Sequence, residues 1–448
     1  MKRLVVLFSL LCFGIVSFSQ DISFATDREG LPVIEARLSK AIALSDLLGY
    51  AYLSNPAITA SKASWQIFIE NYRIGKSYPD PTLVTTFFPN PIETRLGPQD
   101  WNLTLSQAIP FPGTLAQKGR VLEADVRIAK LTVDKTLKEI VQTISTSFYE
   151  LAYVQKAIQI AKVNLQMNQQ LLGISQNAYA QDKALFYDIS KARAQTAQIQ
   201  YDILLLEELE QAEKTKLNTL LNRPPDAQLG QTTQVFPRHP VYSLNEIYDL
   251  AMIFQEDILI ADEMVQKAED AIRLTQYENL PSFKLGLFYA GIGQPDVATP
   301  PKDAGEDAVG VQVGLNLPLW FGKNKSQTTR ALSVRAKARA DKTLTANRTK
   351  AVISRLWFKL QNSKRLMALY KDQLLPQALA SVQTAETWFR EGQGTFSDFL
   401  EVQATAYNFQ LALERATADY GKTLVQLEQL AGILLDTKIE APKGENKS

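Results

Sequence analysis

The side chains that most often carry protein chemistry are scarce in this sequence. Its 448 residues include one cysteine, Cys12, and one histidine, His239. Disulfide frameworks, thiolate or imidazole metal sites and catalysis by Cys or His need more of these residues than the chain has. The five methionines follow no common spacing, which favours core filling over a soft-metal relay. We therefore expect no enzyme activity, no cofactor and no metal site.

Carboxylates at predicted helix starts are the remaining candidates. Asp398 and Glu401 lie three residues apart, so they share one face of a helix. Asp188 lies at the corresponding place in the first half of the chain. Acids at a helix start can simply complement the helix dipole, so any further role depends on where the fold places them. His239, next to Pro240, is expected to be a linker residue rather than a ligand.

The bulk composition excludes two classes of protein. Lys and Arg number 48 against 47 Asp and Glu. This balance argues against a nucleic-acid-binding protein, which normally shows a basic excess collected on one face. Hydrophobic residues at 46% with charged residues at 21% exclude wholesale disorder.

The first residues have the pattern of a secretory signal. Met1, Lys2 and Arg3 form a basic start, and the apolar run at 4–16 is too short for a stable transmembrane helix. We assign residues 1–20 to a cleaved signal peptide of the Sec type, which would remove Cys12. Because no later segment offers about 18 uninterrupted apolar residues, entry into a membrane would require a β-barrel.

An internal repeat organises the rest of the chain. The helical pattern that starts at Asp188 recurs 210 positions later, where it starts at Asp398. Near the front of each half the offset is 200, because the second half has a longer polar loop between its strands. The resulting segments are an N-terminal extension at 21–43, a first repeat at 44–222, an equatorial linker at 223–243, a second repeat at 244–435 and a disordered tail at 436–448.

Each repeat has the same predicted order of helix, two strands, long helix, turn and shorter helix. The strands are predicted at 82–88, 101–109, 282–290 and 309–319. Each alternates an apolar face with a polar or small one and has about the length of a bilayer-spanning strand. Taken alone, such a strand also fits the half-buried sheet of a soluble domain. Four strands cannot close a membrane barrel, whose smallest form has about eight, so closure would need several copies of the chain.

The long helices exceed what a compact domain holds. Between Leu137 and Leu172, Leu or Ile recurs every seven residues, which defines a coiled-coil seam. A helix over 114–178 would be about 95 Å long. We predict that it faces two shorter helices placed end to end. The same arrangement is expected in both halves, with 114–178 against 44–76 and 187–221, and with 323–389 against 245–279 and 396–432.

This layout and several local stretches resemble the TolC family of outer-membrane efflux and secretion ducts, over about residues 40–435. The stretches are Leu47 through Asn55-Pro56, Pro79-Asp80-Pro81, Leu-Ser-Gln-Ala-Ile-Pro-Phe-Pro-Gly at 105–113, and the tip turns at 179–195 and 389–403. Each stretch is unspecific alone, but their order and duplication are specific. The Pro-Phe-Pro-Gly junction at 110–113 favours the heavy-metal branch of the family.

The resemblance implies a mainly α fold with a small β part. Three copies would join four strands each into one 12-stranded outer-membrane β-barrel, continued by a trimeric α-helical barrel of long antiparallel coiled coils. The implied function is the channel of a tripartite efflux system, which receives metal cations or small toxic compounds from an inner-membrane RND-type pump through a periplasmic adaptor protein. The implied location is the outer membrane of a Gram-negative bacterium, where lipid is a further partner.

Three other functions compete with this one. They are a TolC-like duct for type I protein secretion, a soluble periplasmic coiled-coil adaptor, and an exported enzyme. An adaptor would have a single helical hairpin flanked by compact β domains, whereas this chain has two hairpins and two isolated strand pairs. An exported enzyme would need a catalytic constellation that the sequence does not contain.

The resemblance also assigns roles to the carboxylates. Asp398 and Glu401 match two acidic positions that ring the periplasmic entrance in the best-known family members. A trimer would gather six carboxylates at this constriction, where they would attract cations. Asp188 matches the acidic position of the first tip turn, which in the family helps to hold the closed state through links to neighbouring chains.

The second tip turn departs from the family pattern. Where the best-known member has a basic residue, this chain has Gly394. An identical salt link is therefore not expected, and Arg390 or Arg193 is the candidate to replace the missing cation.

Overall fold

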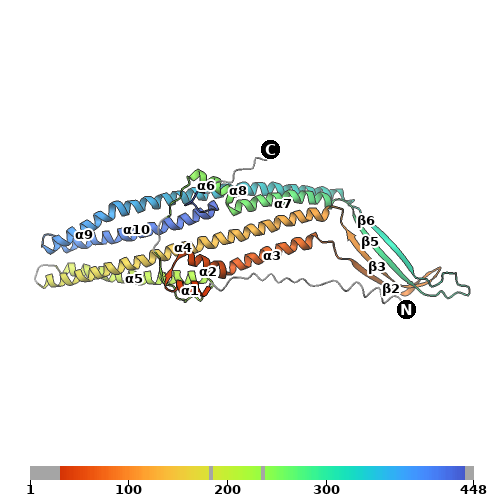
Figure 1. The fold of residues 1–448 in the computed structure, drawn as a ribbon, viewed down its shortest axis with the longest axis horizontal. Helices are drawn as coiled ribbons and strands as arrows, with labels where there is room; N and C mark the ends of the chain where they lie inside the picture. The colour runs from red at the N-terminus through yellow and green to blue at the C-terminus, as the bar shows by residue number, and fades with distance from the viewer. Residues whose placement is uncertain (1–30, 181–184, 234–237, 439–448) are drawn as a thin grey trace.

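The computed structural model describes residues 31–180, 185–233 and 238–438. The molecule is long and narrow, with a sheet at one end and two helical hairpins at the other (Figure 1). The predicted signal peptide, including Cys12, lies outside the described residues.

The helices and strands follow the same order in the two halves of the chain. The first half contains α1 (Leu31–Leu38), β1 (Ala41–Ile42), α2 (Leu44–Ser54), α3 (Pro56–Lys76), β2 (Thr82–Thr94), β3 (Gly97–Ile109), α4 (Thr114–Tyr179) and α5 (Phe186–Leu220). After β4 (Gln231–Thr232), the second half contains α6 (Leu244–Phe254), α7 (Glu256–Glu278), β5 (Ser282–Ile292), β6 (Ala308–Asn316), α8 (Phe321–Leu369), a π-helix (Tyr370–Leu374), α9 (Leu375–Arg390) and α10 (Phe396–Ala431). The predicted fold class, mainly α with a small β part and an internal repeat, is confirmed.

The longest helix, α4, connects the sheet to the far end of the molecule. Its 66 residues correspond to about 100 Å at 1.5 Å per residue. It packs against α3 and α5 of its own half and against α7 and α10 of the other. One long helix therefore faces two shorter helices placed end to end. None of the described helices is both long enough and apolar enough to cross a membrane.

The helices predicted at 44–76 and 245–279 are each broken in two at equivalent positions. Between α2 and α3, Asn55 has extended backbone, and its Oδ1 accepts a hydrogen bond from the N–H of Ala57 at 2.8 Å. Pro56 fits directly after this cap because the first helical position needs no N–H. Between α6 and α7, Gln255 caps in the same way and accepts from the N–H of Ile258 at 3.0 Å.

The helix predicted at 323–389 is interrupted as well. One turn of π-helix at Tyr370–Leu374 separates α8 from α9, whose first turn contains Pro376. Proline has no N–H, and its ring crowds the carbonyl four residues earlier, so it disrupts a regular α-helix. The wider π turn relieves this crowding without ending the rod.

The four long strands form one antiparallel sheet in the order β2-β3-β5-β6. The central pair joins the two halves of the chain, with Leu103 opposite Tyr289 and Leu105 opposite Leu287. β2 and β6 are the edge strands, and each has one edge without a partner in the described chain. The sheet is therefore open on both sides.

Several strand bounds differ from the predicted ones. β2 continues to Thr94, and β3 begins at Gly97 instead of residue 101, so the two are joined by a tight turn. β6 ends at Asn316 instead of residue 319, because the N–H of Leu319 turns back to the carbonyl of Leu317 at 2.9 Å. Turn geometry at strand ends has no clear periodic signal, which explains these errors.

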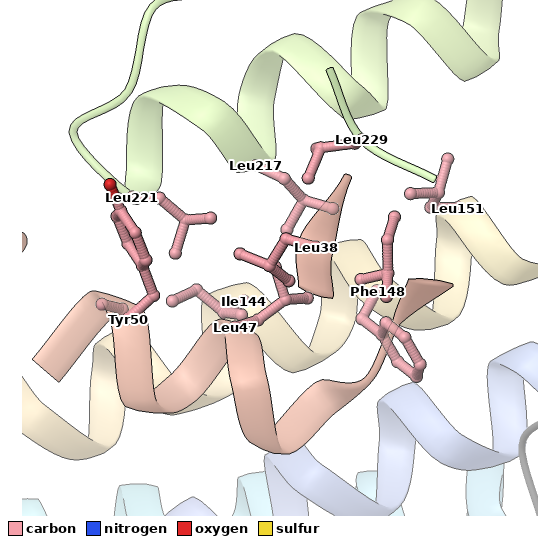
Figure 2. Packing of buried hydrophobic residues seen from close by; sticks show 11 residues of the cluster. Leu38, Leu47, Tyr50, Ile144, Phe148, Leu151, Leu217, Leu221 and Leu229 are labelled. Carbon is pink, nitrogen blue, oxygen red and sulfur yellow. The ribbon is translucent and has the colours of Figure 1, made fainter. Parts of the chain in front are cut away.

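The N-terminal extension packs halfway along the helices. Its strand β1 pairs in parallel with β4 of the linker. Leu38 of α1 and Leu47 of α2 converge with Ile144 of α4 and Leu217 of α5, and all four side chains are 0% exposed (Figure 2). Residues 31–43 thus supply core residues to the first hairpin, which the sequence analysis did not foresee.

Candidate functional site

The tips of the two hairpins lie side by side at the end of the molecule opposite the sheet (Figure 1). One tip joins α4 to α5 and the other joins α9 to α10. A buried apolar cluster connects them, with Leu171 of α4 and Ala192 of α5 packed near Val382 of α9 and Phe396 and Phe399 of α10. Residues 181–184 of the first turn lie outside the described residues. The two tips therefore form one packed unit, and all the predicted gate residues lie on or beside it.

The second tip turn reverses the chain with glycines. Gly392 has φ +73°, a conformation that costs an L residue about 1–2 kcal/mol. Gly394 donates its N–H to the carbonyl of Trp388 at 3.2 Å, and a Cβ on Gly394 would lie only 3.2 Å from the Cβ of Trp388. Gly394, which stands where the best-known family member has a basic residue, thus has a packing role in closing the turn.

Asp398 is part of a capping box at the start of α10. The Oγ1 of Thr395 donates to its carboxylate at 2.6 Å and accepts from the N–H of Asp398 at 3.1 Å. Glu401, one turn later, is exposed, and its side chain makes no ion pair within the described residues. Asp398 therefore has a structural role that Glu401 does not share, although both side chains are exposed on one face.

The other predicted gate residues do not contact this pair. Asp188 lies at the start of α5, where its Oδ2 accepts from the N–H of Leu185 at 3.4 Å. Arg390 pairs with Glu386 on its own helix at 2.6 Å. Arg193 is exposed and has no ion pair among the described residues. Within one chain, the geometry brings neither arginine to Asp398 or Glu401, and a link to a neighbouring copy stays a prediction.

One contact between the tips was missed by the sequence analysis. Lys191 of α5 donates from its Nζ to the Oγ of Ser397 of α10 at 2.5 Å. Lys191 lies 210 positions before Glu401, so the repeat that aligns Asp188 with Asp398 places a cation where the second tip has a carboxylate. Comparing the charges at aligned positions would have identified Lys191 as a candidate.

A buried polar network lies between the hairpins, behind the apolar tip cluster. Gln403 of α10 donates from its Nε2 to the Oδ1 of Asn164 at 3.0 Å, and Asn168 donates to the backbone carbonyl of Asn164 at 2.9 Å. All three side chains are buried. The Nδ2 of Asn164, the Oδ1 of Asn168 and the Oε1 of Gln403 have no hydrogen-bond partner within the described protein. Because unpaired buried polar atoms cost stability, we expect this seam between the hairpins to be less stable than an apolar one.

A charged cluster fixes the linker at the middle of the molecule. Arg238 pairs with the buried Glu428 at 2.8 Å and with Asp436 at 3.0 Å. Burial opposes the charge of Arg238, but the two carboxylates outweigh it and raise the pKa of the guanidinium. Burial also raises the pKa of Glu428, which Arg238 offsets only in part. Asp436, assigned above to a disordered tail, is instead bound by this ion pair, and the residues after 438 lie outside the described part.

His239 is held in the same cluster. Its Nδ1 lies 3.0 Å from the Oη of Tyr420, which donates to the carbonyl of Arg238 at 2.9 Å. Since the Tyr420 hydroxyl proton is used in that bond, the His239 Nδ1 is the donor to Tyr420. Burial raises the pKa of Tyr420 to about 12, so the hydroxyl stays protonated at neutral pH. His239 is thus a linker residue that orients the chain against α10.

An ion network joins α4 to α10 on the tip side of this cluster. Glu150 accepts from Arg415 at 2.8 Å and from Lys422 at 2.6 Å. The guanidinium of Arg415 also lies 3.6 Å from the ring centroid of Tyr153. Burial alone would raise the pKa of Glu150, but the two cations outweigh it and lower this pKa. These ion pairs hold α4 of the first hairpin against α10 of the second.

The fold matches several solved membrane proteins. VceC of Vibrio cholerae gives a TM-score of 0.70 at 18% identity, covering 87% of this chain and 96% of that chain. A membrane protein of Pseudomonas aeruginosa gives 0.75 at 14% identity, covering 88% and 91%. CusC gives 0.74 at 14% identity, covering 87% and 92%. This chain therefore shares their fold, in which long helical hairpins are joined to a small sheet.

A match in sequence covers part of the second half of the chain. Residues 247–433 match the outer membrane efflux protein family. No curated protein sequence matches the chain. The resemblance to TolC-type outer membrane efflux proteins that the sequence predicted is confirmed by this match over residues 247–433 and by the shared fold.

Proposed function

We propose that this protein is the subunit of a homotrimeric duct of a tripartite efflux system. In this system an inner-membrane RND-type pump delivers metal cations or small toxic compounds through a periplasmic adaptor protein to the duct, which releases them outside the cell. The observation that carries the proposal is the open four-stranded sheet joined directly to helices about 100 Å long.

The sheet supports placement in the outer membrane. On β6, the side chains of Val309, Val311 and Val313 are 77%, 73% and 75% exposed in the single chain, while Gln312 and Gly314 occupy the opposite face. Such an apolar row has no soluble partner on the described chain, and lipid is the environment that favours it.

The free edges support assembly into a trimer. Unpaired N–H and C=O groups cannot remain exposed to the hydrocarbon core of a bilayer, and β2 and β6 each leave one edge of such groups. Pairing β6 of one copy with β2 of the next satisfies both edges. Three copies with four strands each give 12 strands, which is more than the minimum of about eight that a membrane barrel needs.

The hairpins support a periplasmic tunnel. They extend from the sheet in one direction, so their tips would lie toward the inner membrane (Figure 1). Asp398 and Glu401 would then line the entrance at which the pump and adaptor deliver their cargo. The exposed pair on one helix face fits a cation-attracting ring.

Type I protein secretion is the alternative within the same fold. The two functions differ in cargo and in pump. The Pro-Phe-Pro-Gly junction, which suggested the heavy-metal branch, has a local structural explanation: Gly113 has φ +93°, and a Cβ there would lie 2.6 Å from the ring of Tyr277. The efflux assignment therefore rests on the family match at 247–433.

Deletion of the gene tests the proposal. We expect greater sensitivity to toxic metals or small antimicrobial compounds, restored by the wild-type gene, and an unchanged set of secreted proteins. Crosslinking of the membrane-embedded protein should stop at the trimer. Unchanged sensitivity together with the loss of one secreted protein would favour type I secretion, and a stable folded monomer in the outer membrane would refute the architecture.

A further inference from the structure

Helix α8 is much more basic than the rest of the chain. It contains thirteen Lys and Arg residues and a single acid, Asp341. Three of these cations have carboxylate partners: Lys337 pairs with Asp341, Arg339 with Glu269, and Lys342 with Asp262. The other ten make no ion pair within the described residues. Ten cations of this helix are therefore available to anions from outside the chain.

The basic helix begins at the helix–strand junction. Lys323, Lys325 and Arg330 are exposed in its first turns. Trp320 and Phe321, directly before them, are 77% and 78% exposed. Aromatic side chains at the bilayer boundary followed by cations at the level of the headgroups are typical of a membrane interface.

The other edge of the subunit carries cations at the same level. Lys76 ends α3, and Lys118 and Arg120 lie in the first turns of α4; all three are exposed. The end of α3 and the start of α4 are in contact, because a Cβ on Gly119 would lie 3.9 Å from the side chain of Lys76. Tyr78, which follows Lys76, is 63% exposed. This edge therefore shows the same combination of cations and an exposed aromatic ring.

Assembly would bring these two edges together. β6 leads into α8, β2 follows α3, and these are the two edge strands. In the proposed trimer, on which this step rests, the start of α8 in one copy faces the end of α3 and the start of α4 in the next. We call this contact between neighbouring subunits the joint. Six cations there make no ion pair within the described residues: Lys76, Lys118, Arg120, Lys323, Lys325 and Arg330. The carboxylates at this level that lack an ion pair in the described chain are Asp80 and Glu278, so positive charge remains in excess.

We infer that each subunit joint binds the phosphate of an anionic phospholipid in the periplasmic leaflet. The cations of neighbouring subunits repel one another when they meet at the joint. An anion bound between them offsets this repulsion. The anion nearest to a membrane-embedded joint is a lipid headgroup, whose acyl chains can lie along the apolar row of β6. Anionic lipid therefore bridges neighbouring subunits and stabilises the trimer.

The test compares matched variants of the purified full-length trimer in nanodiscs. The junction variant is Lys323→Gln, Lys325→Gln and Arg330→Gln. The control is Arg348→Gln, Lys350→Gln and Arg355→Gln, which removes the same charge from the same helix about 40 Å farther from the strands. The midpoint of heat-induced trimer dissociation is measured in phosphatidylcholine alone and in phosphatidylcholine mixed with phosphatidylglycerol.

Phosphatidylglycerol should raise the midpoint of the wild type and of the control, and this rise should be lost in the junction variant. A charge-preserving variant, Lys323→Arg with Lys325→Arg, should keep the rise, which separates loss of charge from loss of folding. An equal rise in the junction variant would overturn the inference. So would an equal rise produced by inorganic phosphate in phosphatidylcholine, because the site would then bind a free anion. Failure to form trimers in any membrane would instead refute the proposed function.

Discussion

Asp188 and Asp398 hold equivalent positions at the starts of the two tip helices. Each carboxylate accepts a hydrogen bond of 3.4 Å from the backbone N–H three residues earlier, that of Leu185 in the first hairpin and that of Thr395 in the second. The internal repeat thus preserves a helix cap at both tips. Only the second tip adds a carboxylate one turn later, at Glu401, where the first has Lys191.

This difference predicts that Asp398 and Glu401 have separable roles. Glu401→Gln should weaken block by trivalent cations and lower the cation preference in single-channel recordings, because it removes three of six carboxylates from the proposed ring. The thermal stability should stay unchanged, since the Glu401 side chain has no ion pair in the described chain.

Thr395→Ala provides the structural comparison for Glu401→Gln. It removes the side-chain cap of α10 and should cost about 1 kcal/mol with little effect on selectivity. If Glu401→Gln leaves conductance, selectivity and block at wild-type values in assembled trimers, the carboxylates are only solvated charges at a helix start.

The orientation in the membrane is tested with single cysteines. The natural Cys12 lies in the predicted signal peptide, so cleavage at the predicted place would leave a cysteine-free background. A cysteine at Gln393, on the second tip, should be unreachable for a membrane-impermeant reagent added to intact cells, and so should one at Gln181, which lies outside the described residues. A cysteine at Asp303, in the loop between β5 and β6, should be labelled. The reverse pattern would refute the placement of the sheet in the outer membrane.

The long periodic elements were predictable because their signal is repeated many times. The seven-residue spacing from Leu137 to Leu172 predicted a long coiled-coil helix. The alternation from Val309 to Leu315 predicted a strand with one apolar face. Features that depend on a single residue were not predicted. At Asn55 and Pro56 one helix ends and the next begins, although the spacing of the apolar residues continues unchanged. Pro376 does not end its helix, because one turn of π-helix before it accommodates the proline ring.

The candidate site was predictable only in part, because the sequence of a helix does not show which partners its charged side chains contact. Asp398 and Glu401 could be placed on one face from their spacing, but the cap from Thr395 and the pairing of Arg390 with Glu386 depend on side-chain rotamers. The contact of Lys191 with Ser397 joins residues 206 positions apart. No local pattern predicts such a contact, although the repeat identifies the positions worth comparing.

Glu150 should make the hairpins sensitive to acid. Its folded pKa is held below the ordinary value of 4.5 because Lys422 and Arg415 outweigh burial. The unfolded state therefore binds the proton first, and the stabilisation is present above about pH 4.5 and lost as the pH falls through the lower folded value. Glu150→Gln should lower thermal stability at pH 7, and the difference from wild type should shrink below pH 4.5.

Glu428 provides a control of opposite sign. Burial raises its folded pKa above 4.5, so between 4.5 and that folded value the native state holds a proton that the unfolded state lacks. Acidification through this range therefore adds stability through Glu428, and Glu428→Gln should remove that gain. Parallel pH profiles for the two variants, followed by far-UV circular dichroism on heating, would contradict the assignment.

The polar seam between the hairpins should be a source of instability. Asn168 is 0% exposed, and its Oδ1 has no partner in the described protein. An unpaired buried polar atom costs about 1–3 kcal/mol, so Asn168→Leu should raise the thermal midpoint of the helical part if the added methyl groups fit. Asn218, equally buried, donates to the carbonyls of Pro225 and Ala227 at 3.2 and 2.8 Å and accepts from Arg223 at 3.0 Å. Asn218→Leu would leave those groups unpaired and should lower the midpoint. Destabilisation of similar size by both substitutions would show that Asn168 is satisfied in solution and that the seam is not weakened by unpaired groups.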